Sequence, residues 1–396
     1  MKGTRWRISR WQLLLIVFTL SLCVTPFALP PLLIPVLGAR AAWLGTLPAF
    51  GVGLWGIAVT ATLAARFPGQ SVDRLAIRLL GPVFGYMYLA ALAALFLAGA
   101  PANLLVYTGA AHAAMLPHLP RAYVAILVAA VGTYAARSGP ETIARCAGVL
   151  APLLLGGLAA IYLPMLLEAH FGVLLPLRPL AWRQWLSPPV LGASGTIRGF
   201  LPLLVLGPLT TPSITKGPLL GANALAWVLV IAAVMLPVTI FDAPLAREMS
   251  LPLLAAEGTM AWHWLPLRNL VPLVMLVWYV ITFVVFATYL WMGAWLLERL
   301  LPFLPRRGPA LAFGVAAAVG GSFDLEEPTV RAVFITWNVA VVVLGVLMPT
   351  VLCLARKGGG RRDREHPLDP PGSVRRDGAW RRAHRAVPLR RAGASR

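Results

Sequence analysis

Residues Arg66–Gly81 read RFPGQSVDRLAIRLLG and join two long apolar runs, 41–65 and 82–100. Pro68 and Gly69 stand shortly after the first run. Proline cannot continue a hydrogen-bonded helix and glycine relaxes the turn, so this pair predicts a helix end. The segment is therefore expected to be a short connector between two helices, each built from one of the apolar runs.

The second part of this connector predicts a short amphipathic helix. Ser71 can cap its N-terminus, and Asp73 falls in the first turn, where the positive end of the helix dipole favours an acid. Helical spacing separates the leucines from the arginines, as suits the boundary between membrane and water. The leucines are Leu75, Leu79 and Leu80, and the arginines are Arg74 and Arg78. Together with Arg66, they mark this side of the membrane as cytoplasmic.

The composition independently indicates a membrane protein. Of the 396 residues, 59% are hydrophobic and only 12% are charged, and the mean hydropathy is +0.78. Soluble domains carry about 25% charged residues. The chain is therefore predicted to be an all-α integral membrane protein.

The formal net charge is +20, and residues 356–396, with 13 basic and four acidic side chains, supply +9 of it. Because residues 357–396 are rich in glycine, proline and arginine, they are expected to form a basic, disordered cytoplasmic tail. A basic tail beside a membrane serves topology and contact with anionic membrane lipid. Nucleic acid is not an expected partner.

Ten apolar runs approach the roughly 20 residues that a spanning helix needs. They are 11–37, 41–65, 82–112, 121–136, 142–167, 195–213, 217–241, 266–298, 308–322 and 331–355. Lysine and arginine are more frequent in the segments assigned to the inside than in those assigned to the outside, which include Arg198. This bias predicts an even number of spans, about ten, with both termini cytoplasmic.

The sequence offers no pattern typical of an enzyme or a metal site. Cys23, Cys146 and Cys353 are scattered, without a disulfide framework or metal-ligand spacing. No Ser/His/Asp arrangement, phosphate loop or pair of carboxylates stands out, so no catalytic residue, cofactor or metal is predicted. No ionisable residue is expected at mid-depth either. Coupled transporters usually keep one there, so a transporter-shaped receptor is favoured over a pump.

Two spans contain proline breaks at matching positions. Thr25 and Pro26 lie near the middle of the first span, and Gly207 and Pro208 near the middle of the sixth. A proline frees backbone carbonyls that hydrocarbon cannot satisfy. Such interruptions survive where they line a polar cavity, and a matched pair points to a transporter-type binding site. Ordinary proline kinks are the alternative interpretation.

Several motifs resemble the endospore-germination permease family, the GerAB-type B subunits of spore germinant receptors. They are the connector RFPG with its following serine, acid and LLG, then ISRWQL at 8–13, AWL at 42–44 and YAARSGPETIAR at 134–145. The resemblance implies the LeuT-like fold of the amino acid–polyamine–organocation superfamily. In that fold, a membrane domain, 1–356, contains two five-span inverted repeats, about 1–170 and 190–356, with spans one and six broken.

The implied fold would place a ligand pocket between spans one, three, six and eight. Free backbone amides at the first break can hold a ligand carboxylate, and residues one helical turn apart can face the same space. The candidate ligand-binding residues are Thr25, Pro26, Phe27, Ala28, Asn103, Tyr107, Gly207, Pro208, Thr210, Thr211, Tyr279 and Thr282.

The resemblance further implies a membrane subunit of a nutrient-germinant receptor, located in the spore inner membrane or cell membrane. Such a subunit would bind a small nutrient, expected to be an amino acid. It would then signal through a two-state helix arrangement to the A and C subunits of the receptor. A stand-alone permease for an amino acid or small organic solute is the alternative, and a non-catalytic scaffold is a third hypothesis.

Overall fold

The computed structural model describes residues 7–23, 25–67, 69–116, 118–177, 179–210, 215–260, 270–305 and 307–355. Within these ranges the chain is helical, apart from its connections and one isolated bridge between Ile8 and Thr210. The all-α prediction is therefore confirmed for the described residues. The predicted tail, 357–396, and the candidate residue Thr211 lie outside them.

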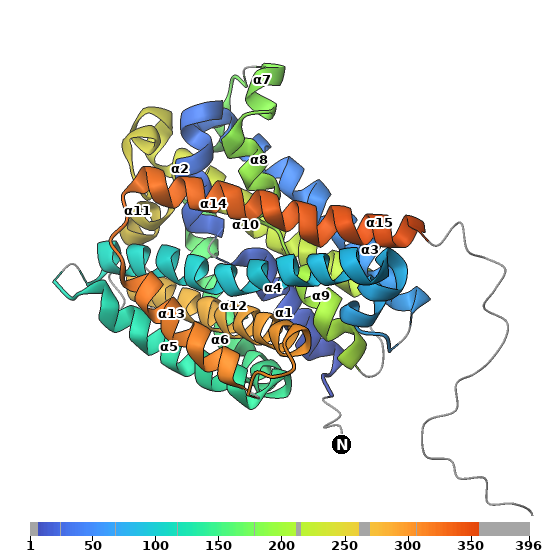
Figure 1. Cartoon of the computed structure of the whole chain (residues 1–396). Coiled ribbons are helices and arrows are strands. Elements are labelled where there is room, and N and C mark those ends of the chain that lie inside the picture. The colour runs from blue at the N-terminus through green and yellow to red at the C-terminus, as the bar shows by residue number, and fades with distance from the viewer. Residues whose placement is uncertain are drawn as a thin grey trace, which may run out of the picture. The chain divides into compact units, whose positions relative to one another are not determined.

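The helices follow the order of the predicted spans (Figure 1). The first half contains α1 (Arg10–Leu22), α2 (Thr25–Leu37), η1 (Ala39–Thr46), α3 (Leu47–Arg66), α4 (Val72–Ala114), α5 (Arg121–Ser138) and α6 (Pro140–Leu167). The connection to the second half holds η2 (Phe171–Leu174) and α7 (Trp182–Trp185). The second half contains α8 (Pro188–Ser194), α9 (Leu201–Leu206), η3 (Gly207–Leu209), α10 (Lys216–Glu248), α11 (Pro252–Thr259), α12 (Val271–Leu300), α13 (Gly308–Ser322), α14 (Glu327–Val342), η4 (Val343–Leu347) and α15 (Met348–Ala355).

Seven stretches of the described chain are long and apolar enough to cross a membrane. The remaining three predicted spans correspond to shorter or interrupted helices, namely α5, α13 and the pair α8–α9. These three lie among the longer helices: α13 packs against α5 and α4, and α8 packs against α14 and α3. Neighbouring helices thus support the spans that are weakest by length alone.

The bundle is centred on α1, α2 and α12. The most apolar window of Arg10–Leu37 is 88% buried and that of Val271–Leu300 is 78% buried, whereas Ala39–Arg66 and Glu327–Ala355 are each 33% buried. α12 packs against α4, α5 and α6, and α1 packs against α10 and α6. The outer helices instead expose large apolar side chains such as Trp55 of α3. Exposed apolar side chains on these helices suit contact with lipid.

The connector has the predicted helical form. α4 begins at Val72, directly after Ser71, whose backbone is extended as an N-cap requires but whose side chain makes no capping hydrogen bond. Arg74 is exposed and Leu75 is buried, which confirms the amphipathic pattern. Gly81 has a φ of 80° and separates this short helix from the span that follows. Only glycine adopts such a backbone without strain.

Asp73 ties the connector to the core of the bundle. Its carboxylate pairs with Arg299 near the end of α12, although Asp73 is only 8% exposed. The Arg299 guanidinium also lies 4.1 Å from the centre of the Trp295 ring. The acid that was predicted to complement a helix dipole therefore also forms an ion pair across two spans.

The first break lies where the sequence predicts it. α1 ends at Leu22, Cys23 has a positive φ of 36°, and α2 begins at Thr25. Three prolines, Pro30, Pro31 and Pro35, then lie inside α2 without ending it. The first break is thus confined to the short segment around Cys23.

The break in the sixth span lies earlier than predicted. α8 ends at Ser194 and α9 begins at Leu201, so residues 195–200 are the non-helical segment. The predicted break at Gly207–Pro208 is wrong in position, because these residues form the helical turn η3 directly after α9. Pro208 stands in the first turn of η3, where a missing N–H leaves no hydrogen bond unmade.

Candidate ligand-binding site

The non-helical segment of the sixth span, 195–200, lies in close contact with the first and tenth spans. A Cβ atom added at Gly195 would lie 2.8 Å from the carbonyl carbon of Asn338 on α14. One added at Gly199 would lie 2.8 Å from the carbonyl oxygen of Val17 on α1. Glycine at both positions therefore lets this backbone approach its neighbours closely.

Arg198 is the one charged side chain of this segment, and it is 1% exposed. Its Nη1 atom donates a hydrogen bond of 2.9 Å to Oδ1 of Asn338. Its Cζ atom lies 4.5 Å from the centre of the Trp337 ring, a distance typical of a cation–π contact. The thiol of Cys23 and the hydroxyl of Tyr289 also lie beside the guanidinium.

Two sequence-based expectations about charge are corrected by this arrangement. Arg198 was assigned to the outer side, and no ionisable residue was expected at mid-depth. The helical part of the sixth span already begins with α8 at Pro188 and continues to Leu206 at the end of α9. Position 198 therefore falls near the middle of the span, and its guanidinium is buried there.

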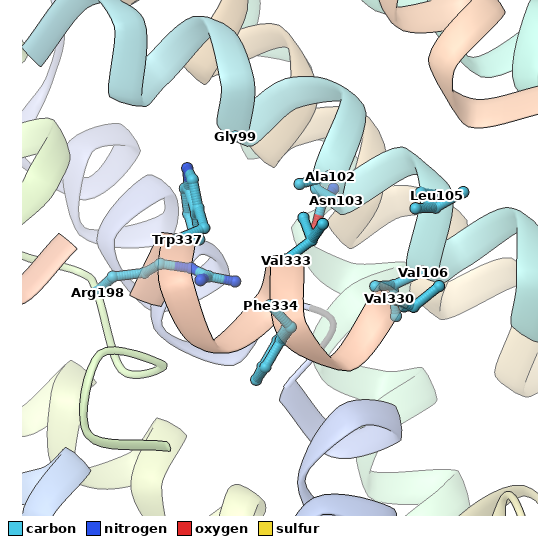
Figure 2. Close-up of a pocket in the computed structure, with 10 residues that line it drawn as sticks. All are labelled: Gly99, Ala102, Asn103, Leu105, Val106, Arg198, Val330, Val333, Phe334 and Trp337. Carbon is cyan, nitrogen blue, oxygen red and sulfur yellow. The ribbon is translucent and has the colours of Figure 1, made fainter. Parts of the chain in front are cut away.

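A small cavity lies between Arg198 and α4 (Figure 2). Its volume is ≈ 20 Å³, enough for about one water molecule. Asn103 of α4 lines this cavity together with Arg198, and the guanidinium extends toward the side from which Asn103 projects. The Oδ1 atom of Asn103 accepts from Sγ of Cys23 at 2.8 Å, whereas its Nδ2 atom is buried without a hydrogen-bond partner.

A larger cavity adjoins the small one. Its volume is ≈ 400 Å³, within the range of small-molecule sites. The two cavities share Leu105, Val106, Val330 and Phe334 in their walls. These four apolar residues therefore form the partition between an open chamber and a narrow recess, which contains Asn103 and Arg198.

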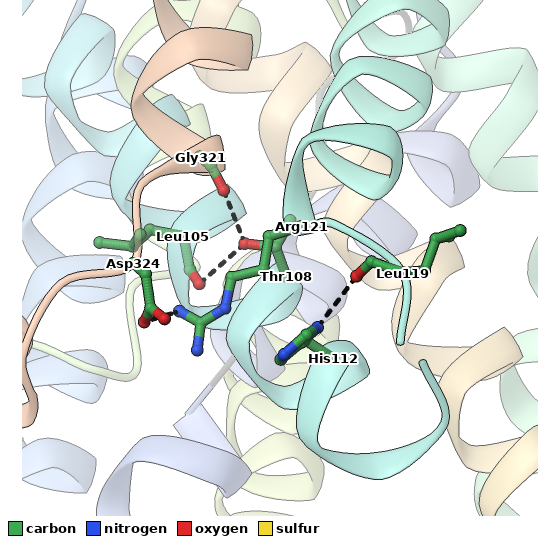
Figure 3. A network of polar contacts seen from close by, with 7 residues as sticks. All are labelled: Leu105, Thr108, His112, Leu119, Arg121, Gly321 and Asp324. Carbon is green, nitrogen blue, oxygen red and sulfur yellow. Dashed lines mark hydrogen bonds and ion pairs between the residues drawn. The ribbon is translucent and has the colours of Figure 1, made fainter. Parts of the chain in front are cut away.

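The rim of the larger cavity carries charges of both signs. Arg121 lines the cavity and forms an ion pair of 2.9 Å with Asp324 (Figure 3). Glu327 and Arg331 line it as well. The guanidinium of Arg331 donates to the carbonyl oxygen of Leu32 at 3.1 Å, which fixes α14 to α2 beside the cavity.

The residues predicted around the first break are brought together. Phe27 and Ala28 line the larger cavity. Thr25 is buried and its hydroxyl donates to the carbonyl oxygen of Thr196 at 3.5 Å, so it joins the two breaks. Pro26 is buried next to it.

Other predicted residues lie near this group without lining either cavity. The Tyr107 hydroxyl donates to the carbonyl oxygen of Met275 at 3.3 Å, and the Tyr107 ring centre lies 6.5 Å from that of Tyr279. Thr282 is buried, and its hydroxyl has no hydrogen-bond partner. Tyr107 and Tyr279 thus join α4 to α12.

The residues predicted at the sixth-span break lie elsewhere. Gly207, Pro208 and Thr210 follow α9 at the end of the bundle where the described chain starts, because the backbone of Ile8 bonds to the carbonyl oxygen of Leu209 at 3.2 Å. None of the three lines either cavity.

Sequence reasoning missed Arg198, Trp337 and Asn338. One signal was available: the segment GTIRGF at 195–200 places a charged residue and two glycines next to a long apolar stretch. An ionisable residue within a span indicates a functional site, and glycines permit close helix contacts. Nothing local in the sequence marks Trp337 or Asn338, because their role depends on packing between distant spans.

Comparison with known proteins agrees with the fold. A family model described as spore germination protein matches residues 7–319. No curated protein matches the chain significantly. Among solved structures, MhsT in complex with L-phenylalanine is similar with a TM-score of 0.64, 15% identity, and coverage of 89% of this chain and 90% of that one. A Na⁺-coupled sialic acid symporter in a substrate-bound outward-open state is similar with a TM-score of 0.58, 12% identity, and coverage of 89% and 79%.

At such low identity the two structures establish the fold, which is the LeuT-like fold of membrane transporters. The family model spans most of the chain and includes both breaks. The chain is an integral membrane protein that belongs to the spore germination permease family.

Proposed function

We propose that the protein is the membrane subunit of a spore nutrient-germinant receptor. It binds a small nutrient, an amino acid, in the cavities beside the two broken spans and passes a signal to the receptor's A and C subunits. In this proposal the membrane domain comprises residues 1–356, built from repeats at about 1–170 and 190–356, and lies in the spore inner membrane. Both termini are cytoplasmic, the tail contacts anionic lipid, and no step of the function is catalytic.

The observation that carries this proposal is the partition between the two cavities. The larger chamber, ≈ 400 Å³, can admit an amino acid, whereas the recess at the breaks, ≈ 20 Å³, cannot. A ligand that reaches Arg198 must therefore displace apolar side chains that separate the two cavities, such as Phe334 of α14. A ligand that binds the opened arrangement better than the closed one shifts the population between them, which is the requirement for a signal.

The proposal is tested by deleting the gene in its spore-forming host. Spores without it are expected to lose the response to at least one nutrient, measured as release of dipicolinic acid, and the intact gene in trans should restore that response. The control is germination triggered by direct calcium dipicolinate, which bypasses nutrient receptors and should be unchanged. Spores that respond normally to every nutrient would contradict the receptor function.

A stand-alone permease is the second candidate, and the fold favours it because solved transporters share that fold. Purified protein in liposomes would then show saturable, stereoselective uptake of an amino acid. Uptake should be measured under sodium and proton gradients in turn, with empty liposomes as the control. Specific binding without flux under either gradient would exclude the permease and leave the receptor.

A further inference from the structure

We infer that Arg198 and Asn103 form a carboxylate-binding subsite, so that the ligand of this protein carries a carboxylate that enters the small cavity between them. The inference rests on the proposed function and specifies the chemistry of the ligand. It assigns recognition of the charged end of the ligand to the sixth and third spans rather than to backbone amides of the first break alone.

The first argument is the charge of Arg198. A guanidinium remains protonated in proteins, and burying an unpaired charge is costly unless hydrogen bonds and an opposite charge compensate. Among the described residues, the partners of Arg198 are the amide oxygen of Asn338, the ring of Trp337, and the neighbouring thiol and hydroxyl of Cys23 and Tyr289. These groups are neutral and leave one positive charge without a carboxylate.

The second argument is the set of donors that remain free. The Nε atom of Arg198 and the Nδ2 atom of Asn103 are both buried without a hydrogen-bond partner. The two side chains line the same small cavity (Figure 2). A carboxylate has two oxygens that accept hydrogen bonds, and its pairs with arginine are strong and directional. It matches both the charge and the donors of this recess.

The third argument is the surroundings. Most residues that line the recess are apolar, among them Val333 and Phe334. An apolar wall lowers the local dielectric and strengthens an ion pair. It also provides no other partner for a bound carboxylate, so the strength of binding should depend on the two named side chains.

A purely structural role for Arg198 makes different predictions. If the guanidinium only fixed the non-helical segment to Asn338 and Trp337, its replacement would lower the stability of the protein without changing which ligands bind. The decisive measurement therefore compares ligands that differ only in the carboxylate, in variants whose stability without ligand is measured separately.

The experiment uses the purified full chain in detergent, with thermal unfolding recorded against the twenty L-amino acids and the corresponding L-amino acid amides. At least one free acid is expected to stabilise the wild type, and its amide is expected to bind on the order of 100-fold more weakly, as for loss of a buried charge pair.

Arg198→Gln should weaken binding of the acid by a similar factor and leave the amide unaffected. Arg198→Lys keeps the charge but loses the planar fork, and an intermediate loss is expected. The control is Arg183→Gln, the same change at an exposed residue of α7, which should bind like the wild type.

A second variant, Asn103→Asp, tests the inference even if the Arg198 variants fail to fold. It places a carboxylate inside the recess, where it can pair with Arg198. The variant should therefore unfold at a higher temperature than the wild type without ligand, and should no longer be stabilised by the acid. An Asn103→Asp protein that still binds the acid like the wild type would overturn the inference.

A second probe separates this inference from the proposed function. Sodium acetate is titrated against acetamide, with sodium chloride at the same ionic strength as the reference. Stabilisation of the wild type but not of Arg198→Gln by acetate supports the subsite even if no amino acid binds, and an amino-acid nutrient would then be excluded. The subsite would be overturned if the amides bound as tightly as the acids. It would also be overturned if neither acetate nor any free acid stabilised the wild type.

Discussion

Alanine at Gly195 is expected to destabilise the protein by about 3 kcal/mol, at the upper end of the range for overpacking. The backbone of Gly195, with φ −88° and ψ 4°, is open to any residue, so the cost is steric alone. The new methyl group would lie 2.8 Å from the Asn338 carbonyl carbon and closer still to its oxygen. Both clashing groups are backbone, and the helix α14 cannot relax by turning a side chain.

Thermal unfolding of the purified full chain, together with the yield of monodisperse protein, checks this prediction. Gly207→Ala is the matched control, because Gly207 has a helical backbone and no atom within 4 Å of an added Cβ. That variant should be neutral or more stable by about 0.4–1 kcal/mol, through reduced entropy of the unfolded chain. Equal unfolding temperatures for the two alanine variants would contradict the close contact between the sixth and tenth spans.

The parts of the fold that were predictable depend on local chemistry. Three local features were enough to predict the structure of the connector: the Pro68-Gly69 pair, a capping residue, and the spacing of leucines and arginines. The structure confirms the connector helix from Val72 to Leu80 and the turn at Gly81. The first break was likewise predicted from a proline at mid-span, and the chain departs from helix at Cys23, beside it.

The sixth-span break was misplaced because the Gly207-Pro208 pair was taken to mark it. Proline is tolerated in the first turn of a helix, and Pro202 and Pro208 both occupy such positions, in α9 and η3. The real break follows from glycines that allow close contact with other spans. That contact is a property of the packed bundle, so a pattern within one span does not disclose it.

Only some of the candidate binding residues lie beside the cavities. Phe27, Ala28 and Asn103 line the cavities, whereas Thr25 hydrogen-bonds to the second break through the Thr196 carbonyl. Arg198 was missed because its depth depends on where the helix of the sixth span begins. Its partners on α14 are 139 and 140 residues away in sequence, and only the tertiary arrangement brings them together.

Glutamine at Glu257 is expected to stabilise the protein at neutral pH, and to flatten the dependence of stability on pH. Glu257 lies on α11, in the connection between α10 and α12, and is fully buried. Both of its carboxyl oxygens lack a hydrogen-bond partner in the described structure, as does the hydroxyl of the neighbouring Tyr162. Burial raises the pKa of Glu257 well above its usual value.

The sign of the effect follows from linkage. Because the pKa is higher in the folded state, folding favours the protonated acid, and this contribution is complete below the unfolded pKa of about 4.3. It is lost as the pH rises through the interval up to the folded pKa, at about 1.4 kcal/mol per pH unit. Glutamine stays neutral over the whole interval and keeps nearly the same shape, so the variant should gain most relative to wild type near neutral pH.

Unfolding temperatures of the full chain between about pH 4 and pH 8 test this prediction. The wild type should lose stability with rising pH more steeply than Glu257→Gln, whereas Glu248→Gln, at an exposed residue of α10, should retain the wild-type slope. Ser250 and Leu251, just before α11, line the larger cavity. Ionisation of Glu257 therefore weakens the packing of α11, and the two residues directly before this helix form part of the cavity wall. If the unfolding temperatures of the wild type and Glu257→Gln changed with pH in parallel, the Glu257 carboxyl would be solvated or paired. The prediction that it is buried in its neutral form would then be contradicted.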